Sequence, residues 1–328
     1  MSLRLKTTCA PNPRIQPLVD REVKVDGVEF DWNLQPVPML FRNNIANDDL
    51  EFSEMSISET LLTIDRKEEF GRGRWEWWGI PIYLSRGHFW GGMYVNAASG
   101  VTDLRDLKGK QVGVPDYCMT AALWMRILLK DLYGIEAGDI SWHNLRPREE
   151  SQAIALELDK DPPPGVTVNW QIEGDAVEML ERGELDAAIG LRGPRLAESS
   201  KVRKLMPDDA KAVFAEFFRK TGCFQPNHHF VLQRRIVDER PELPPALYGA
   251  FENSKRVAYE RNEKESCLYF EGDSLEEQAK VYGEDPYPLG LSAMSRTLQR
   301  AIQGSLEQGL IRKPVKLEDV YHPGTLAT

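Results

Sequence analysis

Residues 110–134 have the sequence KQVGVPDYCMTAALWMRILLKDLYG, and this stretch decides the fold class. Its first five residues alternate like a buried strand, which Pro115 ends because proline lacks a backbone donor. An apolar helical segment follows over Ala121–Tyr133, with Thr120 as its expected N-cap and Gly134 as its stop. This order of strand, loop and helix is typical of parallel sheets covered by helices.

The same order recurs further along the chain. Asp175 is expected to cap a short helix that Gly183 ends, and Leu185–Ile189 resumes with strand character. In the C-terminal third, Pro244 opens one amphipathic helix and another stops before Gly309. The predicted fold class is therefore α/β.

Length and charge narrow the function classes. The chain has 328 residues, enough for two domains, and a net charge of −10. Such a chain repels a phosphate backbone, so we expect no nucleic-acid partner. The richest apolar stretch, Ala121–Tyr133, is interrupted by Arg126 and Lys130 and is too short to span a bilayer, so we expect a soluble protein with no membrane contact.

The cysteines and the N-terminus bear on the compartment. Four cysteines are spread too widely for a zinc pattern or a disulfide framework. The first residues, MSLRLKTTCAP, lack the apolar stretch of a secretory signal. We therefore expect a cytoplasmic protein, although a chain with its leader removed would look the same.

Several stretches, spread over most of the chain, together resemble one family, the 4,5-dihydroxyphthalate decarboxylases. They are Phe52–Ser58, Ile80–Arg86, Met93–Asn96, Leu104–Pro115, Tyr117–Trp124, Thr221–Phe224 with His228, Tyr287–Leu291 and Glu307–Leu310. The run DLKGKQVGV within them is the least specific, because many proteins with periplasmic-binding-protein-like folds share such a run. The combination with the later stretches is more specific.

The resemblance implies a type II periplasmic-binding-protein architecture of two α/β lobes with a ligand cleft between them. The first lobe would comprise residues 1–95 and 222–328, and the second residues 96–221. The ligand would be a small aromatic carboxylate bound in the hinge cleft. A homo-oligomer is compatible with this architecture.

Two positions are candidates for holding a substrate carboxylate. Thr120, with Met119 before it, lies at a helix N-terminus, where free backbone N–H groups attract an anion; Thr120 can equally be a simple N-cap. Arg86 follows a predicted strand, and its planar guanidinium can bind a carboxylate through two parallel bonds. The alternative for Arg86 is a salt bridge, and Arg192 is a weaker candidate of the same kind.

Ser53, Glu54 and Ser56 match the family closely. We expect them in a loop where a strand leads into a helix, with a serine bonding the ligand and Glu54 accepting a hydroxyl proton. The alternative is that Ser53 or Ser56 caps the helix and Glu54 supports that cap.

His228 and His229 are adjacent on a predicted strand, so their side chains point to opposite faces. His228 is the one that matches the family, and its ordinary pKa near neutrality would let it give a proton to a ring carbon. The alternative is a packing histidine. One departure concerns Arg86–Trp90, where a family cation is missing, an indole replaces a histidine, and His88 lies two residues earlier.

These residues predict a carboxy-lyase that acts on a hydroxylated phthalate without a cofactor. Arg86 and the N–H groups near Thr120 would hold the retained carboxylate, and His228, or His88 in its place, would protonate the ring. A divalent metal at His228 and Glu54 stays open, although no tight ligand motif occurs. The rivals are a binding protein without chemistry and another cytoplasmic enzyme on the same scaffold.

Overall fold

The chain is divided into two compact units. The computed structural model describes residues 2–47, 50–71, 73–86, 92–170, 175–191, 194–206, 210–268 and 273–328. The first unit comprises Met1–Arg86, Gly222–Arg300 and Val315–Thr328, and the second Gly87–Thr221 and Ala301–Pro314. Residues 87–95 and 301–314, expected in the first lobe, thus belong to the second unit.

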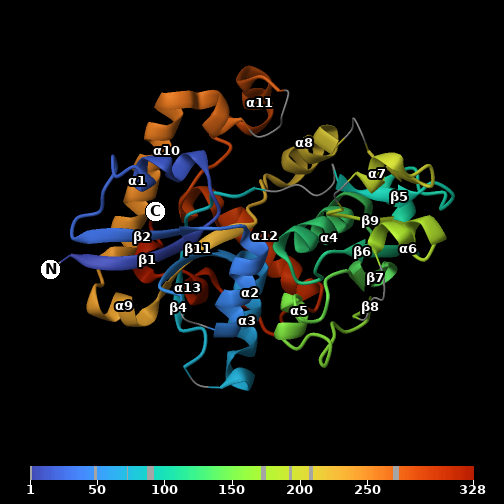
Figure 1. Ribbon diagram of the computed structural model, residues 1–328, viewed down its shortest axis with the longest axis horizontal. Helices are drawn as coiled ribbons and strands as arrows, with labels where there is room; N and C mark the ends of the chain where they lie inside the picture. Colours follow the sequence, from blue (N-terminus) through green and yellow to red (C-terminus); the bar gives the residue numbers. More distant parts are fainter. Residues whose placement is uncertain are drawn as a thin grey trace. The chain divides into compact units, whose positions relative to one another are not determined.

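A five-stranded mixed sheet forms the centre of the first unit (Figure 1), in the order β2-β1-β3-β11-β4. The strands are β1 (Leu3–Cys9), β2 (Val28–Leu34), β3 (Phe52–Ser56), β4 (Trp77–Ile80) and β11 (His228–Gln233). β1 pairs in parallel with β2 and β3, whereas β11 runs antiparallel to both β3 and β4. The distant β11 therefore lies between two strands of the N-terminal region.

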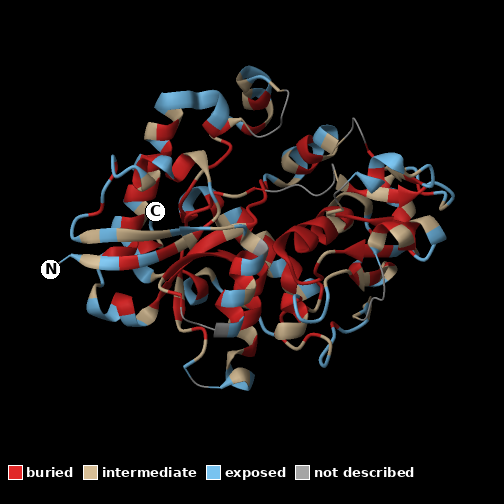
Figure 2. Ribbon diagram, viewed as in Figure 1, coloured by how far each residue is buried: buried red, intermediate tan, exposed pale blue. Residues whose placement is uncertain are grey.

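Helices of the first unit flank this sheet. They are η1 (Pro13–Ile15), α1 (Gln16–Val19), α2 (Val37–Asn47), α3 (Ile57–Phe70), α9 (Arg234–Glu239), α10 (Leu243–Cys267), α11 (Leu275–Tyr282), α13 (Leu317–Val320) and η5 (Pro323–Thr325). A further helix, α12 (Leu291–Glu307), contributes residues to both units. The inner strands of the sheet are buried: this holds for all five residues of β3 and the last five of β11. Strand β2 at the edge has only intermediate and exposed residues (Figure 2).

The second unit contains a six-stranded sheet in the order β10-β5-β9-β6-β7-β8. Its strands are β5 (Tyr94–Asn96), β6 (Gln111–Val114), β7 (Ser141–Asn144), β8 (Thr167–Asn169), β9 (Ala187–Ala188) and β10 (Val202–Lys204). Its helices are η3 (Leu104–Leu107), α4 (Thr120–Tyr133), η4 (Ala137–Asp139), α5 (Gln152–Ala155), α6 (Ala176–Arg182), α7 (Arg195–Glu198) and α8 (Ala210–Thr221). Strands β9, β6, β7 and β8 are parallel, which confirms the α/β class.

The predicted helix stops are confirmed. Gly134 and Gly183 end α4 and α6 with left-handed φ values of 68° and 74°, and Asp175 caps α6 by accepting from two backbone N–H groups. Thr120 as a cap is wrong: Met119 is the N-cap residue, and its side chain makes no capping hydrogen bond. Thr120 is itself the first helical residue, so its hydroxyl lies too far along the helix to cap it.

Two other local expectations need correction. Ser53, Glu54 and Ser56 lie in strand β3 and not in a loop, because pairing with β11 extends the strand up to the helix cap. The strand expected over Leu185–Ile189 is only two residues long, Ala187–Ala188. None of the helices in the described part of the chain has the length and hydropathy required to cross a bilayer.

Gly79 on β4 is required by the close approach of the C-terminal segment. A Cβ at Gly79 would lie 2.9 Å from the Val320 carbonyl oxygen, where Tyr321 bridges to this strand.

We expect Gly79→Ala to lower the free energy of unfolding by about 1–3 kcal/mol in urea titrations, because the backbone at Val320 must move. The exposed Gly249 of α10 has no atom within 4 Å of such a Cβ, and Gly249→Ala should raise stability by about 0.5–1 kcal/mol. Equal effects of the two substitutions would show that the Val320 carbonyl does not restrict position 79 to glycine.

Candidate active site

A pair formed by buried Glu54 and half-buried His228 is the centre of the site in the first unit. Strands β3 and β11 are in a register that places His228 opposite Ser56 and Phe230 opposite Glu54. The Nδ1 atom of His228 lies 2.8 Å from Oε1 of Glu54, whose side chain is only 3% exposed. The acceptor carboxylate fixes Nδ1 as the protonated nitrogen and leaves Nε2 as the atom that can exchange a proton with a ligand.

The surroundings of Glu54 hold the pair rigidly. Its second oxygen, Oε2, accepts a hydrogen bond of 2.9 Å from the backbone N–H of Ala10, directly after β1. The ring of Phe41 from α2 packs edge-on against the His228 imidazole, with centroids 4.6 Å apart. The pair thus lies where the parallel strands β1 and β3 end, which is the edge of an open α/β sheet where ligands bind.

His229 lies in a different environment, as the alternation of strand residues predicts. Its Nε2 is 2.8 Å from the Thr60 hydroxyl and its Nδ1 3.1 Å from the Tyr321 hydroxyl. Because Thr60 donates its only proton to the Ser56 carbonyl, its oxygen accepts from Nε2–H, and Nδ1 accepts from Tyr321. Burial lowers the pKa of His229 to about 3, helped by the neighbouring His228, so this ring is neutral.

Arg86 is buried in the first unit and bonds backbone carbonyls. Its Nη1 donates to the Phe224 carbonyl at 2.5 Å and its Nη2 to the Pro288 carbonyl at 3.3 Å. The guanidinium also lies 4.8 Å from the centre of the Phe224 ring. These bonds differ from the carboxylate salt bridge that was the alternative, and the role of Arg86 in substrate binding stays a prediction.

The two serines have local partners. Ser56 is the N-cap of α3 and accepts from the Glu59 N–H, so the capping alternative holds for this residue. Ser53 is fully buried and its hydroxyl accepts from the side chain of Asn44, which also donates to the Glu54 carbonyl. Asn44 was not predicted from the sequence, because nothing in its own segment marks it as a neighbour of β3. Ligand contacts of the two serines stay predictions.

The other predicted site residues belong to the second unit or lie outside the described residues. Thr120 and Met119 belong to the second unit, where both are buried at the start of α4. His88 and Arg192 lie outside the described residues. Within the described ranges, no group of three or more His, Cys, Asp or Glu side chains is arranged to hold a metal ion.

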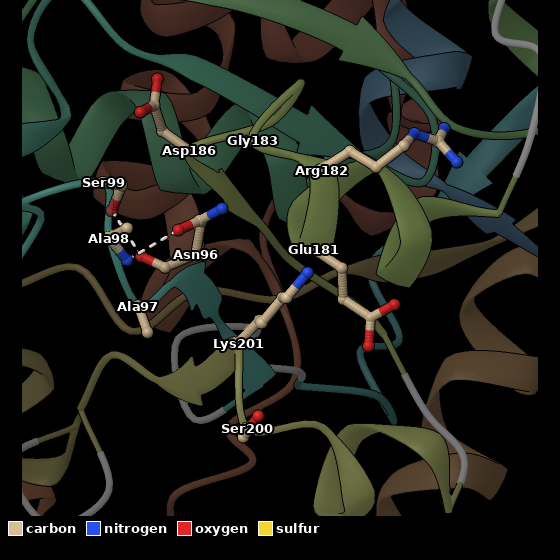
Figure 3. A pocket seen from close by; sticks show the side chains of 10 residues that line it. All are labelled: Asn96, Ala97, Ala98, Ser99, Glu181, Arg182, Gly183, Asp186, Ser200 and Lys201. Carbon is tan, nitrogen blue, oxygen red and sulfur yellow. Dashed lines mark hydrogen bonds between the residues drawn. The ribbon is translucent and has the colours of Figure 1, made fainter.

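A separate pocket of about 640 Å³ lies in the second unit. Figure 3 shows it between the end of β5 and the turn that follows, with Asn96 and Ser99, and the end of α6, with Glu181 and Arg182. Both Asn96 amide atoms are engaged: Oδ1 accepts from Ala98 N–H and Nδ2 donates to the Leu180 carbonyl. The pocket contains none of the residues that the sequence predicts for the site.

Two curated proteins are similar in sequence. A 4,5-dihydroxyphthalate decarboxylase of Comamonas testosteroni is 29% identical over 331 residues, covering 99% of this chain and 98% of the relative. A 4,5-dihydroxyphthalate decarboxylase of Pseudomonas putida is 33% identical over 184 residues, covering 55% of this chain and 67% of the relative. The chain belongs to the 4,5-dihydroxyphthalate decarboxylase family. A comparison with models of known protein families finds no match.

The fold of this decarboxylase family member is shared with solved structures of low sequence identity. The periplasmic sulfonate-binding protein SsuA from Methylobacillus flagellatus KT superposes with a TM-score of 0.55 at 13% identity, covering 99% of this chain and 93% of that one. The desulfurization enzyme DszB gives 0.51 at 15% identity, covering 99% and 98%. The architecture is therefore the two-lobed, periplasmic-binding-protein-like one, and it serves both binding proteins and an enzyme.

The neutral state of His229 predicts a pH dependence of stability. Unfolded histidine takes up a proton below its ordinary pKa of about 6.5, whereas buried His229 stays neutral to a pKa of about 3. The contribution of His229 to the free energy of unfolding should thus be fully present above pH 6.5. It should fall by about 2 kcal/mol between pH 6.5 and 5. Urea unfolding of wild type and His229→Gln at both pH values would measure it.

The variant His322→Gln is a matched control for that measurement, because His322 is only half-buried and burial lowers its pKa less than that of the fully buried His229. We expect it to keep most of the pH dependence. An undiminished pH dependence in His229→Gln would show that His229 is not the group responsible.

Proposed function

We propose that this chain removes one carboxylate from 4,5-dihydroxyphthalate or a closely related hydroxylated aromatic acid. The relatives named for that reaction support the substrate class. The observation that carries the proposal is the contact of 2.8 Å between the buried Glu54 carboxylate and the Nδ1 atom of His228. It supplies what the reaction requires, a proton donor held in one orientation.

The proposed reaction is a proton transfer followed by loss of carbon dioxide. Protonated His228 gives its Nε2 proton to the ring carbon that bears the departing carboxylate. The hydroxyl para to that carbon stabilises the ring cation, the bond from the ring to the carboxylate breaks, and its electron pair restores aromaticity. The products are carbon dioxide and 3,4-dihydroxybenzoate, and solvent returns the proton to the imidazole.

Glu54 has a different role in this proposal from the one the sequence suggested. Both of its oxygens are engaged, with His228 and with the Ala10 N–H. A carboxylate so placed is not available to accept a substrate proton, but it orients the imidazole and stabilises its positive charge. Glu54 is thus a positioning residue for His228.

In this proposal, the positive charge of Arg86 attracts the retained carboxylate of the substrate. The residues directly before Arg86 and His228 are hydrogen-bonded to each other: the Ser85 carbonyl accepts from the Asn227 N–H at 3.0 Å. Buried positive charge favours an anionic ring over a neutral one.

Decarboxylase activity can be measured directly. Purified protein is incubated with 4,5-dihydroxyphthalate, phthalate and hydroxybenzoates, and carbon dioxide and ring absorbance are followed with and without a chelator. We expect carbon dioxide in equal amounts with 3,4-dihydroxybenzoate from the first compound. Tight binding without release of carbon dioxide would instead support a binding protein.

Replacement of His228 by Asn should mainly affect turnover. General acid catalysis contributes about 10²–10⁴ in rate, so kcat should fall by about that factor while KM changes by only about twofold. Steady-state kinetics on 4,5-dihydroxyphthalate measure both. Full activity in this variant would remove His228 from the mechanism.

Replacement of Glu54 by Gln should lower kcat by about tenfold to a hundredfold, the usual cost of losing a group that orients a catalytic side chain. Glu51→Gln is the matched control, because Glu51, directly before β3, also accepts a backbone N–H, that of Lys6 at 2.8 Å. Glu51→Gln should keep kcat. Equal losses in the two variants would mean that Glu54 acts only through the stability of β3.

A further inference from the structure

The segment Cys223–Asn227 leads into β11 immediately before His228 and is unusual for an irregular segment. It has no regular secondary structure, yet all five of its residues are buried. Connecting segments normally run over the surface, because buried irregular backbone and side chains leave polar groups without water. The polar groups of this segment therefore need an explanation.

The backbone of the segment is fixed on both sides. The Asn227 N–H donates to the Ser85 carbonyl at 3.0 Å, and the Asn227 carbonyl accepts from the Ile57 N–H at 3.2 Å. Three residues earlier in the chain, the Phe224 carbonyl accepts from Arg86. The positions of Gln225 and Asn227 relative to His228 are thus set by the segment after β4 and by the start of α3.

Two side chains of the segment stand out by their unsatisfied polar atoms. Gln225 is 2% exposed and Asn227 5% exposed. In the part of the chain that the structure describes, Nε2 of Gln225 and Oδ1 of Asn227 are buried without a hydrogen-bond partner. By contrast, the equally buried Gln278 donates from its Nε2 to the Cys267 carbonyl at 3.0 Å. Such unsatisfied groups are rare and destabilise a fold unless something binds them.

Gln225 and Asn227 are distinguished by their closeness to His228 in the chain. Trp77 Nε1 and Ser305 Oγ also lack a partner among the described residues, but they lie on β4 and α12, apart from each other and from His228 in the chain. Gln225 and Asn227 stand on either side of Pro226 and within three residues of His228. One is a donor and the other an acceptor.

We propose that Gln225 and Asn227 recognise the two neighbouring hydroxyl groups of the substrate ring. Gln225 Nε2 donates to one hydroxyl oxygen, and the other hydroxyl donates to Asn227 Oδ1. This inference rests on the proposed function, since it assumes that the ring protonated by His228 is a vicinal diol. A site built to hydrogen-bond hydroxyls rejects the analogue without them, because its buried amides then stay unpaired.

The test compares two probes, 4,5-dihydroxyphthalate and phthalate, which lacks the hydroxyls. Their dissociation constants are measured by calorimetry for Gln225→Met and Asn227→Leu, each in a His228→Asn background that slows turnover. We expect each substitution to weaken binding of the dihydroxy probe about tenfold and that of phthalate less than about twofold. Wild-type protein that does not distinguish the two probes would overturn the inference.

Thermal unfolding without ligand supplies a second measurement. Gln225→Met and Asn227→Leu remove polar atoms that have no partner among the described residues, so their Tm should equal or exceed that of the parent. Gln278→Met is the matched control: it breaks the bond to Cys267 and should lower Tm without changing the ratio of the two dissociation constants. A lowered Tm with an unchanged ratio in Gln225→Met and Asn227→Leu would show that both amides are structural.

Failure of this inference differs from failure of the proposed function. Release of carbon dioxide by the wild type, with binding indifferent to the two amides, would leave the decarboxylase and remove the hydroxyl recognition. Binding of the dihydroxy probe that depends on the two amides, without release of carbon dioxide, would keep the hydroxyl recognition and remove the decarboxylase.

Discussion

The antiparallel pairing of β11 with β3 is the constraint on which the site depends. Glu54 and His228 are 174 residues apart in the chain, and this register alone brings their side chains to 2.8 Å. Each of the two strands has a neighbour on its other side, β1 and β4, so the register is held from both edges. A slip of one residue would turn His229 toward Glu54 and bury His228 among the partners of its neighbour.

Two adjacent histidines acquire different chemistry from what surrounds them. His229 is enclosed by the hydroxyls of Thr60 and Tyr321, which stabilise a neutral ring and offer no negative charge. His228 instead contacts the carboxylate of Glu54. The burial of that carboxylate is offset by the imidazole on one oxygen and the Ala10 N–H on the other. One strand therefore contains both a neutral structural histidine and a candidate acid.

The sequence predicted features that depend on neighbours along the chain. Gly134, Gly183 and Asp175 mark helix ends because their conformational or hydrogen-bonding preference acts within one turn, and the opposite faces of His228 and His229 follow from strand geometry alone. Contacts between distant segments were beyond such local reasoning, and only the family resemblance placed Glu54 and His228 in one site. The partner of Glu54, the carbonyls that Arg86 bonds and the unsatisfied amides of Gln225 and Asn227 all depend on which strands lie side by side. The prediction that Thr120 is the N-cap was wrong for a local reason, because the helix begins at Thr120 itself, one residue earlier than expected.

A fold shared with sulfonate-binding proteins and with an enzyme does not itself decide between binding and catalysis. The placement of Glu54 does bear on that choice. A protein that only binds an aromatic dianion gains from cations and N–H donors, and a buried carboxylate beside the ligand would weaken the binding by repulsion. The same carboxylate is useful where a histidine must carry a proton, because it stabilises the imidazolium from the side away from the ligand. The Glu54–His228 pair is therefore better suited to giving a proton to the ring than to holding its carboxylates.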